Sequence, residues 1–405
     1  MKKTIIFLGG SFHQFSPIKY AKQQNIRVVL CDSDKSCYSK KYADAFYNIS
    51  IDDKKKILRV AKKEKVNGIL AYATEVGATT QAWVAQKLNL PGNPVKSVKI
   101  LSYKNRFRKF LKINKIFYPA NKTFQNSYDF KKFIQKNLNK KFIIKPVDSS
   151  GSKGIQIIDN QLNLLKKFKK ALTYSSQKKV ICEEYVDKVG AQIAGDGFIF
   201  KKKLVFFHWA DQYFNDYPNK IIPIAESWPS SLNSTQKKII EKTINKIVSK
   251  LKIDFGCFNF DMQFVEKKKL MIIEIGPRNG GDFIPEAIKL STGVDMIKLS
   301  VDTCLGKKVS KNFLIKKFIK PIATYRINSK KNGKFHNILI SKKIISNIVQ
   351  KKIYLKKGNK IKKFFLGQNS IGNLILQFKS KLEMINKMNN INDYFKITFI
   401  DKDNV

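Results

Sequence analysis

The chain lacks the features that mark a membrane protein, a disulfide scaffold or a zinc site. No apolar run approaches the ~20 residues that span a bilayer. Its five cysteines are odd in number and show no C-x-x-C spacing, which favours reduced thiols in the cytoplasm. The three histidines are scattered without an acidic partner in the sequence, so no catalytic triad is indicated. The first apolar run ends at Gly9-Gly10 and is better explained as a β-strand than as a signal peptide.

Arginine is also scarce, although the chain is strongly basic. Only six of its 79 Lys and Arg residues are arginine, and its formal net charge is +49. Proteins that read base edges favour the arginine fork, and lysine is spread over the whole of this chain. We therefore expect no specific nucleic-acid partner. A weak attraction to polyanions or acidic membrane surfaces is the alternative.

The 405 residues allow about two to three domains, and the first is predicted over residues 1–95. Strands and helices alternate there as in a doubly wound α/β unit with a parallel sheet. Gly9-Gly10 and Asp32 partly match a dinucleotide-binding pattern, but its third glycine is missing, so NAD is not expected. The predicted strands are Thr4–Leu8, Arg27–Cys31 and Gly68–Tyr72, and the predicted helices are Pro17–Gln24, Lys54–Glu64 and Ala78–Leu88.

Two acidic residues are expected to meet in a predicted β-hairpin. Apolar and polar residues alternate around Asp261 and again around Glu274, so these residues lie on neighbouring strands. Two carboxylates in an otherwise apolar segment repel each other unless a hard cation lies between them. The pattern therefore predicts a metal site, and a solvated turn with a salt bridge is the alternative.

A single arginine and two glycines follow this hairpin. Arg278, Asn279, Gly280 and Gly281 form a predicted loop whose guanidinium and backbone N–H groups suit an anion. Metal-binding carboxylates beside an anion site indicate phosphoryl transfer. These four residues are accordingly the predicted catalytic loop.

A second motif joins a lysine in an apolar strand to a loop of small residues. Lys145 carries a charge that is costly in such a strand unless it meets an anion, and a nucleotide phosphate would serve. The loop leads into a strand at Ile155 rather than into a helix, so it is a flap and not a P-loop. Its hydroxyl and N–H groups suit phosphates, and an ordinary hairpin turn is the alternative. The flap residues are Ser149, Ser150, Gly151, Ser152 and Gly154.

The third motif is the segment Val180-Ile-Cys-Glu-Glu-Tyr-Val186, a short strand that ends in polar residues. Another strand begins at Ile193, which makes the segment between them a predicted hinge between two subdomains. Backbone N–H and C=O groups exposed at such a hinge can pair with an adenine edge.

In their order and intervals, these motifs resemble the ATP-grasp superfamily, which includes biotin carboxylase, D-alanine–D-alanine ligase and the L-amino-acid ligases. The resemblance covers roughly residues 1–320. It implies ATP as a cofactor, together with Mg²⁺ or Mn²⁺. For the nucleotide, it implies phosphate-binding lysines at Lys104 and Lys145, a closing loop at residues 148–154, an adenine hinge at Glu183, Glu184 and Val186, and a ribose contact at Gln192. For the metal, it implies magnesium ligands at Asp261 and Glu274. For the substrate, it implies that Arg278 holds the carboxylate or the acyl phosphate.

Two positions depart from the family pattern. Gly276 stands where the family usually has a third metal ligand, an asparagine, so water, Asn259 or Asn279 would have to replace its oxygen. Gln192 stands where the family usually has Glu or His, and it keeps a hydrogen-bonding group without the charge.

The expected fold class combines α/β and α+β parts. The predicted order is an N-terminal doubly wound parallel sheet, a two-subdomain ATP-grasp fold and a small β-rich C-terminal cap. The predicted domains are residues 1–95, a helical linker at 96–118, the lid at 119–190, the catalytic subdomain at 191–319 and the cap at 320–405.

Four further residues are tentative substrate contacts. Thr74 and Glu75 follow a predicted strand, where a solvated loop is the alternative. Glu226 and Trp228 lie in a predicted polar loop, where Glu226 would face an amine and Trp228 would either line the acceptor pocket or simply pack the loop.

The resemblance implies an ATP-dependent ligase that activates a small carboxylate and joins it to an amine or thiol. A kinase or a biotin-carboxylase-like enzyme with the same nucleotide site is one alternative. A non-catalytic ATP- or polyanion-binding protein with a decayed metal site is another. A homo-oligomer is compatible with the sequence.

Overall fold

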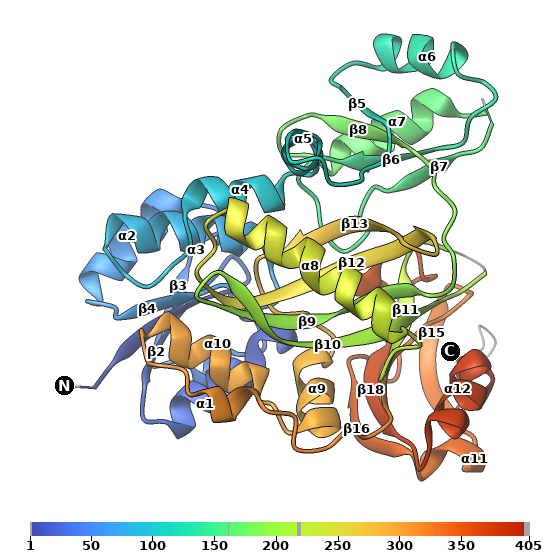
Figure 1. Cartoon of the computed structure of the whole chain (residues 1–405). Helices are drawn as coiled ribbons and strands as arrows, with labels where there is room; N and C mark the ends of the chain where they lie inside the picture. Colours follow the sequence, from blue (N-terminus) through green and yellow to red (C-terminus); the bar gives the residue numbers. More distant parts are fainter. Residues whose placement is uncertain (1, 161, 217–219, 401–405) are drawn as a thin grey trace.

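The computed structural model describes residues 2–160, 162–216 and 220–400. Figure 1 shows three regions along the chain: a blue N-terminal layer, a teal and green layer above the rest, and a central sheet that continues into the red C-terminal part. Within the described residues, no helix is both long enough and apolar enough to cross a bilayer.

The N-terminal layer is the predicted parallel sheet, with the strand order β3-β2-β1-β4. Its inner strand β1 is buried at every position, as expected of a parallel strand covered on both faces. The half-buried edge strand β3 was not predicted, because its short segment has no clear alternation. The elements are β1 (Thr4–Leu8), a 3₁₀ turn (Phe12–Gln14), α1 (Phe15–Gln23), β2 (Arg27–Asp32), a 3₁₀ turn (Lys40–Tyr42), β3 (Ala45–Asn48), α2 (Lys54–Lys63), β4 (Gly68–Leu70) and α3 (Glu75–Lys87).

Two short helices lead into a four-stranded sheet that we call the lid. Its strand order is β5-β8-β6-β7, and β6 and β7 form the predicted hairpin around the flap. The helices α6 and α7 pack their apolar faces against this sheet through Phe130 and Phe168. The elements are α4 (Val95–Ser102), α5 (Lys104–Ile113), β5 (Asn121–Phe124), α6 (Ser127–Gln135), β6 (Phe142–Pro146), β7 (Gln156–Ile158), α7 (Leu164–Thr173) and β8 (Val180–Glu184).

The central sheet has eight antiparallel strands in the order β13-β12-β9-β10-β11-β14-β18-β16. Its last three strands come from the C-terminal part, which therefore extends this sheet as well as adding a small sheet of its own, β17-β15-β19. The strands of the central sheet are β9 (Gln192–Phe200), β10 (Lys203–Phe214), β11 (Pro223–Trp228), β12 (Phe255–Glu266), β13 (Lys269–Gly276), β14 (Ile322–Ile327), β16 (Ile348–Ile353) and β18 (Gly372–Gln377).

Helices cover the two faces of the central sheet unequally. The helix α8 (Ser234–Lys250) packs on one face, against side chains such as Phe258 and Phe260. On the other face, α9 (Ile284–Thr292) and α10 (Met296–Cys304) cover an apolar part. The rest of that second face carries polar side chains and forms the floor of a cavity.

The remaining elements lie outside this arrangement, and the domain boundaries given above remain predictions. These elements are a 3₁₀ turn (Lys311–Leu314), β15 (Gly333–Ile340), α11 (Lys342–Ile345), β17 (Lys360–Ile361), a 3₁₀ turn (Gly367–Asn369), α12 (Lys381–Asn389), a 3₁₀ turn (Ile391–Tyr394) and β19 (Phe395–Phe399).

Candidate active site

A cavity of about 450 Å³ lies between the lid and the polar part of the central sheet. This volume lies within the range of small-molecule sites. The predicted site residues that line it are Glu75, Lys104, Lys145, Ser149, Ser150, Gly151, Ser152, Glu183, Glu184, Val186, Gln192, Glu226, Asp261, Glu274, Arg278, Gly280 and Gly281.

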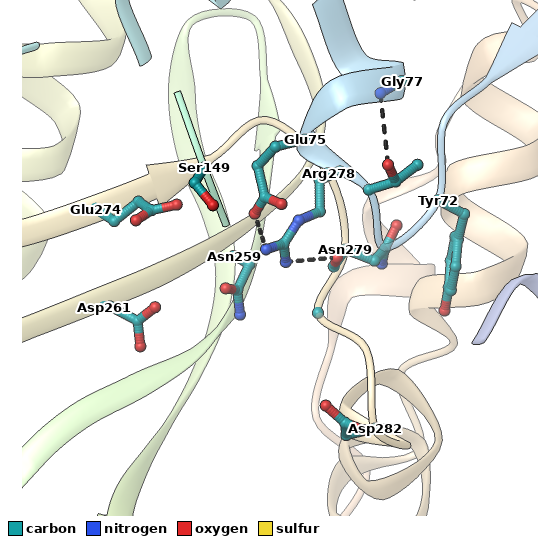
Figure 2. Close-up of polar contacts among 12 residues, drawn as sticks. Tyr72, Glu75, Gly77, Ser149, Asn259, Asp261, Glu274, Arg278, Asn279 and Asp282 are labelled. Carbon is teal, nitrogen blue, oxygen red and sulfur yellow. Dashed lines mark hydrogen bonds and ion pairs between the residues drawn. The ribbon is translucent and has the colours of Figure 1, made fainter. Parts of the chain in front are cut away.

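The two predicted metal ligands face each other in the β12–β13 hairpin. Asp261 pairs in register with Glu274, and both residues line the cavity. Figure 2 shows the two side chains on their neighbouring strands. Burial, followed by the charge of Glu274, raises the pKa of Asp261 to about 7. A nearby cation stabilises the charged form of such a buried carboxylate, and carboxylate oxygens are the donors that Mg²⁺ prefers. The donor set therefore fits a hard divalent ion.

A third oxygen donor is available on the same strand. Asn259 lies opposite Gly276 in the register and lines the cavity, while its Nδ2 donates to Asp196 at 3.0 Å. Asn279 instead accepts a hydrogen bond of 2.5 Å from Ser300 of α10, and it is not among the cavity-lining residues. Of the two predicted replacements for the missing ligand, Asn259 is the better placed.

Lys104 connects the metal hairpin with the flap. Its Nζ lies 3.2 Å from Oε2 of Glu274 and donates to the carbonyl of Ser149 at 2.6 Å. The flap itself turns at Gly151 and Ser152, both with positive φ, and its residues face the cavity except Gly154. At Gly154 a Cβ would approach Pro146 to 2.8 Å, so this glycine is required by packing rather than by a ligand.

Lys145 meets an anion, as predicted, but that anion belongs to the protein. Its Nζ lies 2.7 Å from Oε2 of Glu183, whose Oε1 also accepts a hydrogen bond of 2.7 Å from Nε of Arg108. Burial alone would raise the pKa of Glu183, but the two cations outweigh it and lower the pKa to about 2. Glu183 therefore acts as the shared partner of two cations, whereas it was predicted as an adenine-hinge residue.

The other hinge residues occupy the rim of the cavity. The carbonyl of Val186 accepts a hydrogen bond from Gln263 at 3.0 Å, and Glu184 lies 3.3 Å from Nζ of Lys140. Gln192 donates to Gln212 at 2.7 Å, which places its amide on the cavity floor.

The loop after the hairpin bonds to other parts of the protein, whereas its guanidinium and N–H groups were predicted to bind an anion. Arg278 forms an ion pair with Glu75 and donates to the carbonyl of Asn279 at 2.8 Å, as Figure 2 shows. Its Nε finds no hydrogen-bond partner among the described residues. The N–H of Gly280 donates to both oxygens of Asp196, at 2.9 and 3.0 Å, and is therefore not free for an anion. Arg278, rather than the N–H of Gly280, therefore stays the predicted anion-binding group.

The tentative substrate contacts divide into two pairs of different character. Glu75 and Glu226 line the cavity, whereas Thr74 caps α3 by accepting from the N–H of Gly77 at 3.4 Å. The polar loop predicted around Trp228 is wrong, because this segment is the buried strand β11. Trp228 is fully buried and packs between the sheet and α9, so its packing alternative holds.

Several residues in or next to the cavity were missed in the sequence because their partners lie far away along the chain. Arg108 and Gln212 sit in ordinary helix and strand patterns, and only packing brings them to Glu183 and to Asp261. Asp196 did carry a signal, since a lone acid interrupts an apolar strand. A further missed group is the pair of Arg326 and Asp282, together with His13.

Comparison with protein families matches residues 101–282 to the ATP-grasp domain. Among curated proteins, the formate-dependent phosphoribosylglycinamide formyltransferase of Sulfurisphaera tokodaii is 27% identical over 288 residues, which cover 68% of this chain and 70% of that protein. Among solved structures, the L-amino acid ligase from Bacillus licheniformis has a TM-score of 0.81 at 17% identity and covers 99% of both chains. The phosphoribosylglycinamide synthetase from Anaerococcus prevotii has a TM-score of 0.76 at 18% identity and covers 99% of this chain and 100% of its own.

The matched domain and the shared fold agree with the motif order in the sequence. Residues 101–282 match the ATP-grasp domain, and the chain shares the fold of these solved structures over almost its whole length.

Proposed function

We propose that the protein is an ATP-dependent ligase that activates a carboxylate as an acyl phosphate and joins it to an amine, releasing ADP and phosphate. A thiol is the alternative acceptor. One observation carries the proposal: a single cavity holds the carboxylate pair Asp261 and Glu274, the lid lysine Lys145 and the arginine Arg278 with an unpartnered Nε.

The lid side of the cavity suits a nucleotide. Lys104, Lys145 and the flap from Ser149 to Ser152 offer positive charge, hydroxyls and backbone N–H groups to phosphates. Val186 at the rim suits the adenine, and Gln192 suits the ribose. Asp261 and Glu274 would hold Mg²⁺, or Mn²⁺, which would supply positive charge against the phosphates.

The sheet side suits the carboxylate substrate. Arg278 would hold the carboxylate so that one of its oxygens attacks the γ-phosphorus, the bond from this phosphorus to the β-phosphate oxygen breaks, and ADP leaves. The nitrogen of the amine then attacks the acyl carbon, the carbon–oxygen bond to phosphate breaks, and the nitrogen loses a proton. Closure of the flap over these steps would keep water from hydrolysing the acyl phosphate.

Three further expectations accompany this proposal. The substrates are small molecules, the protein acts in the cytoplasm, and it is able to self-associate. The first is supported by the size of the cavity and the second by five buried cysteines that form no disulfide. The third follows from the sequence expectation alone.

The test is ADP release from ATP and Mg²⁺ in the presence of a panel of amino acids, sugar acids and simple carboxylates. Hydroxylamine in place of the amine should trap the acyl phosphate as a hydroxamate. Carboxylate-dependent hydroxamate supports the ligase. ATP consumption without any hydroxamate would favour the kinase alternative, and ATP binding without turnover would favour the decayed site.

A further inference from the structure

The floor of the cavity continues beyond the metal carboxylates along neighbouring strands. Gln212 of β10 pairs in register with Glu226 of β11. Its Nε2 donates to Oδ1 of Asp261 at 3.0 Å and to Oε1 of Glu226 at 3.2 Å. The amide of Gln212 therefore lies between Glu226 and the predicted metal ligand Asp261.

Glu226 is a buried acid of this cavity that contacts no cation among the described residues. It is 6% exposed, and its Oε2 has no hydrogen-bond partner among the described residues. Three other cavity acids contact a cation: Glu75 contacts Arg278, Glu183 contacts Lys145, and Asp282 contacts Arg326. A buried carboxylate oxygen without a partner is costly, so a functional explanation is needed.

The nearby charges do not compensate Glu226. Burial, followed by the charge of Asp261, raises its pKa to about 8. Arg326 opposes this shift, but its guanidinium is committed to Asp282 and to the carbonyl of Pro223 at 3.1 Å. A cation that enters the cavity would stabilise the charged carboxylate and satisfy its free oxygen at once.

We propose that Glu226 binds the protonated nitrogen of the acceptor amine, so that the second substrate is a primary or secondary ammonium. This inference rests on the proposed ligase function and specifies its acceptor. Glu226 shares the cavity with Arg278, which would hold the activated carboxylate, and lies one amide away from Asp261. The nitrogen would therefore lie near the acyl carbon, and it would attack only after passing one proton to Oε2 of Glu226, because an ammonium has no free lone pair. A quaternary amine lacks the N–H that Glu226 Oε2 requires.

The test uses the full-length protein and the carboxylate that supports hydroxamate formation. Primary and secondary amines are compared for ADP release, and KM for the best amine is measured in wild type and in Glu226→Gln. The variant keeps the shape of the side chain and a hydrogen bond to Gln212, but removes the charge. Asp211→Asn is the matched control, because this half-buried acid adjoins Gln212 on β10 yet bonds to Ser231 on the other face.

We expect KM for the amine to rise by about 10- to 100-fold in Glu226→Gln, the usual cost of losing a charged hydrogen bond. KM for ATP, the Mg²⁺ dependence and hydroxamate formation should stay unchanged, because hydroxylamine is uncharged at neutral pH. Asp211→Asn should keep the wild-type KM for the amine.

Other results would overturn the inference in distinguishable ways. Hydroxamate formation without stimulation by any amine, or an unchanged KM in Glu226→Gln, would remove the ammonium site and leave the ligase intact. A changed Mg²⁺ dependence in Glu226→Gln would indicate that Glu226 is a metal ligand. An equal loss of amine-dependent ADP release and hydroxamate formation in this variant would indicate a structural role. Failure of wild type to form any hydroxamate would overturn both proposals.

Discussion

The guanidinium of Arg278 occupies the space that a side chain at Gly276 would need. A Cβ built on Gly276 would lie 3.2 Å from Cζ and 3.3 Å from Nε of Arg278. Glu75 and the carbonyl of Asn279 hold the arginine in this position, so it has little freedom to move aside. The glycine that replaces the usual metal-binding asparagine thus allows Arg278 to lie close to the metal carboxylates.

Restoring the family residue should therefore harm this protein. In Gly276→Asn the new side chain displaces Arg278, and a shift of about 1 Å in a reacting group lowers the rate by roughly 100-fold. We expect this loss in carboxylate-dependent hydroxamate formation, with ATP affinity retained. Gly276→Ala should show a smaller loss. Higher activity in Gly276→Asn would mean that Arg278 is not the carboxylate ligand.

The carboxylate pair should be essential for metal-dependent turnover. Glu274→Gln removes one charge from the predicted donor set, so ADP release should fall below detection while the fold persists. Glu266→Gln is the control, because it makes the same change at the exposed end of the same hairpin, where Glu266 forms an ion pair with Lys269 at 2.9 Å. Full activity of Glu274→Gln over a Mg²⁺ titration would exclude the metal site as proposed.

Arg108 should be a major determinant of stability, because it joins three parts of the chain. From α5 it reaches Glu183 of the lid, and it donates to the carbonyls of Ile272 and Ile273 in β13 at 3.2 and 2.9 Å. Removing one partner of a buried ion pair costs about 3–5 kcal/mol. Denaturant unfolding of Arg108→Met should show this loss, whereas Arg106→Met, exposed on the same helix, should stay within about 0.5 kcal/mol of wild type.

The sequence predicted the parts of the site that depend on local patterns. Period-two alternation placed Asp261 opposite Glu274, and the register confirms this pairing. The charge in an apolar strand indicated an anion near Lys145, and a nucleotide phosphate was the predicted one. That the anion is Glu183 depends on the pairing of β6 with β8 and on Arg108 from a distant helix, and neither leaves a local pattern.

The wrong prediction around Trp228 has a similar physical origin. Pro223–Trp228 contains a proline and a glutamate, which argued for a polar loop, but pairing with β10 and β14 buries it as a strand. Tertiary pairing thus overrode local composition.

The charge of Glu183 should make the fold sensitive to acid. Its pKa is lowered to about 2, below the value of about 4.3 expected in the unfolded chain. The ionised form therefore stabilises the fold above about pH 4.3, and this contribution is lost as the pH falls toward 2. In Glu183→Gln, stability should be lower at neutral pH and should change less with pH over this interval. The measurement is the free energy of unfolding, obtained by denaturant titration at several pH values. If it changed equally with pH in the two proteins, this assignment would be contradicted.

Arg278→Lys should separate carboxylate activation from nucleotide binding. Lysine keeps the positive charge, but it lacks the planar fork that contacts Glu75 and Asn279 while leaving Nε free for a substrate oxygen. Loss of one such preorganised donor costs about 100- to 1,000-fold in rate, so hydroxamate formation should fall by this factor. ATP affinity, measured by calorimetry with Mg²⁺, should change by less than about twofold, because the arginine contacts Glu75 and Asn279 rather than the lid. Arg59→Lys, exposed on α2, should match wild type in both measurements. Equal losses of ATP affinity and hydroxamate formation in Arg278→Lys would instead place this arginine at the nucleotide.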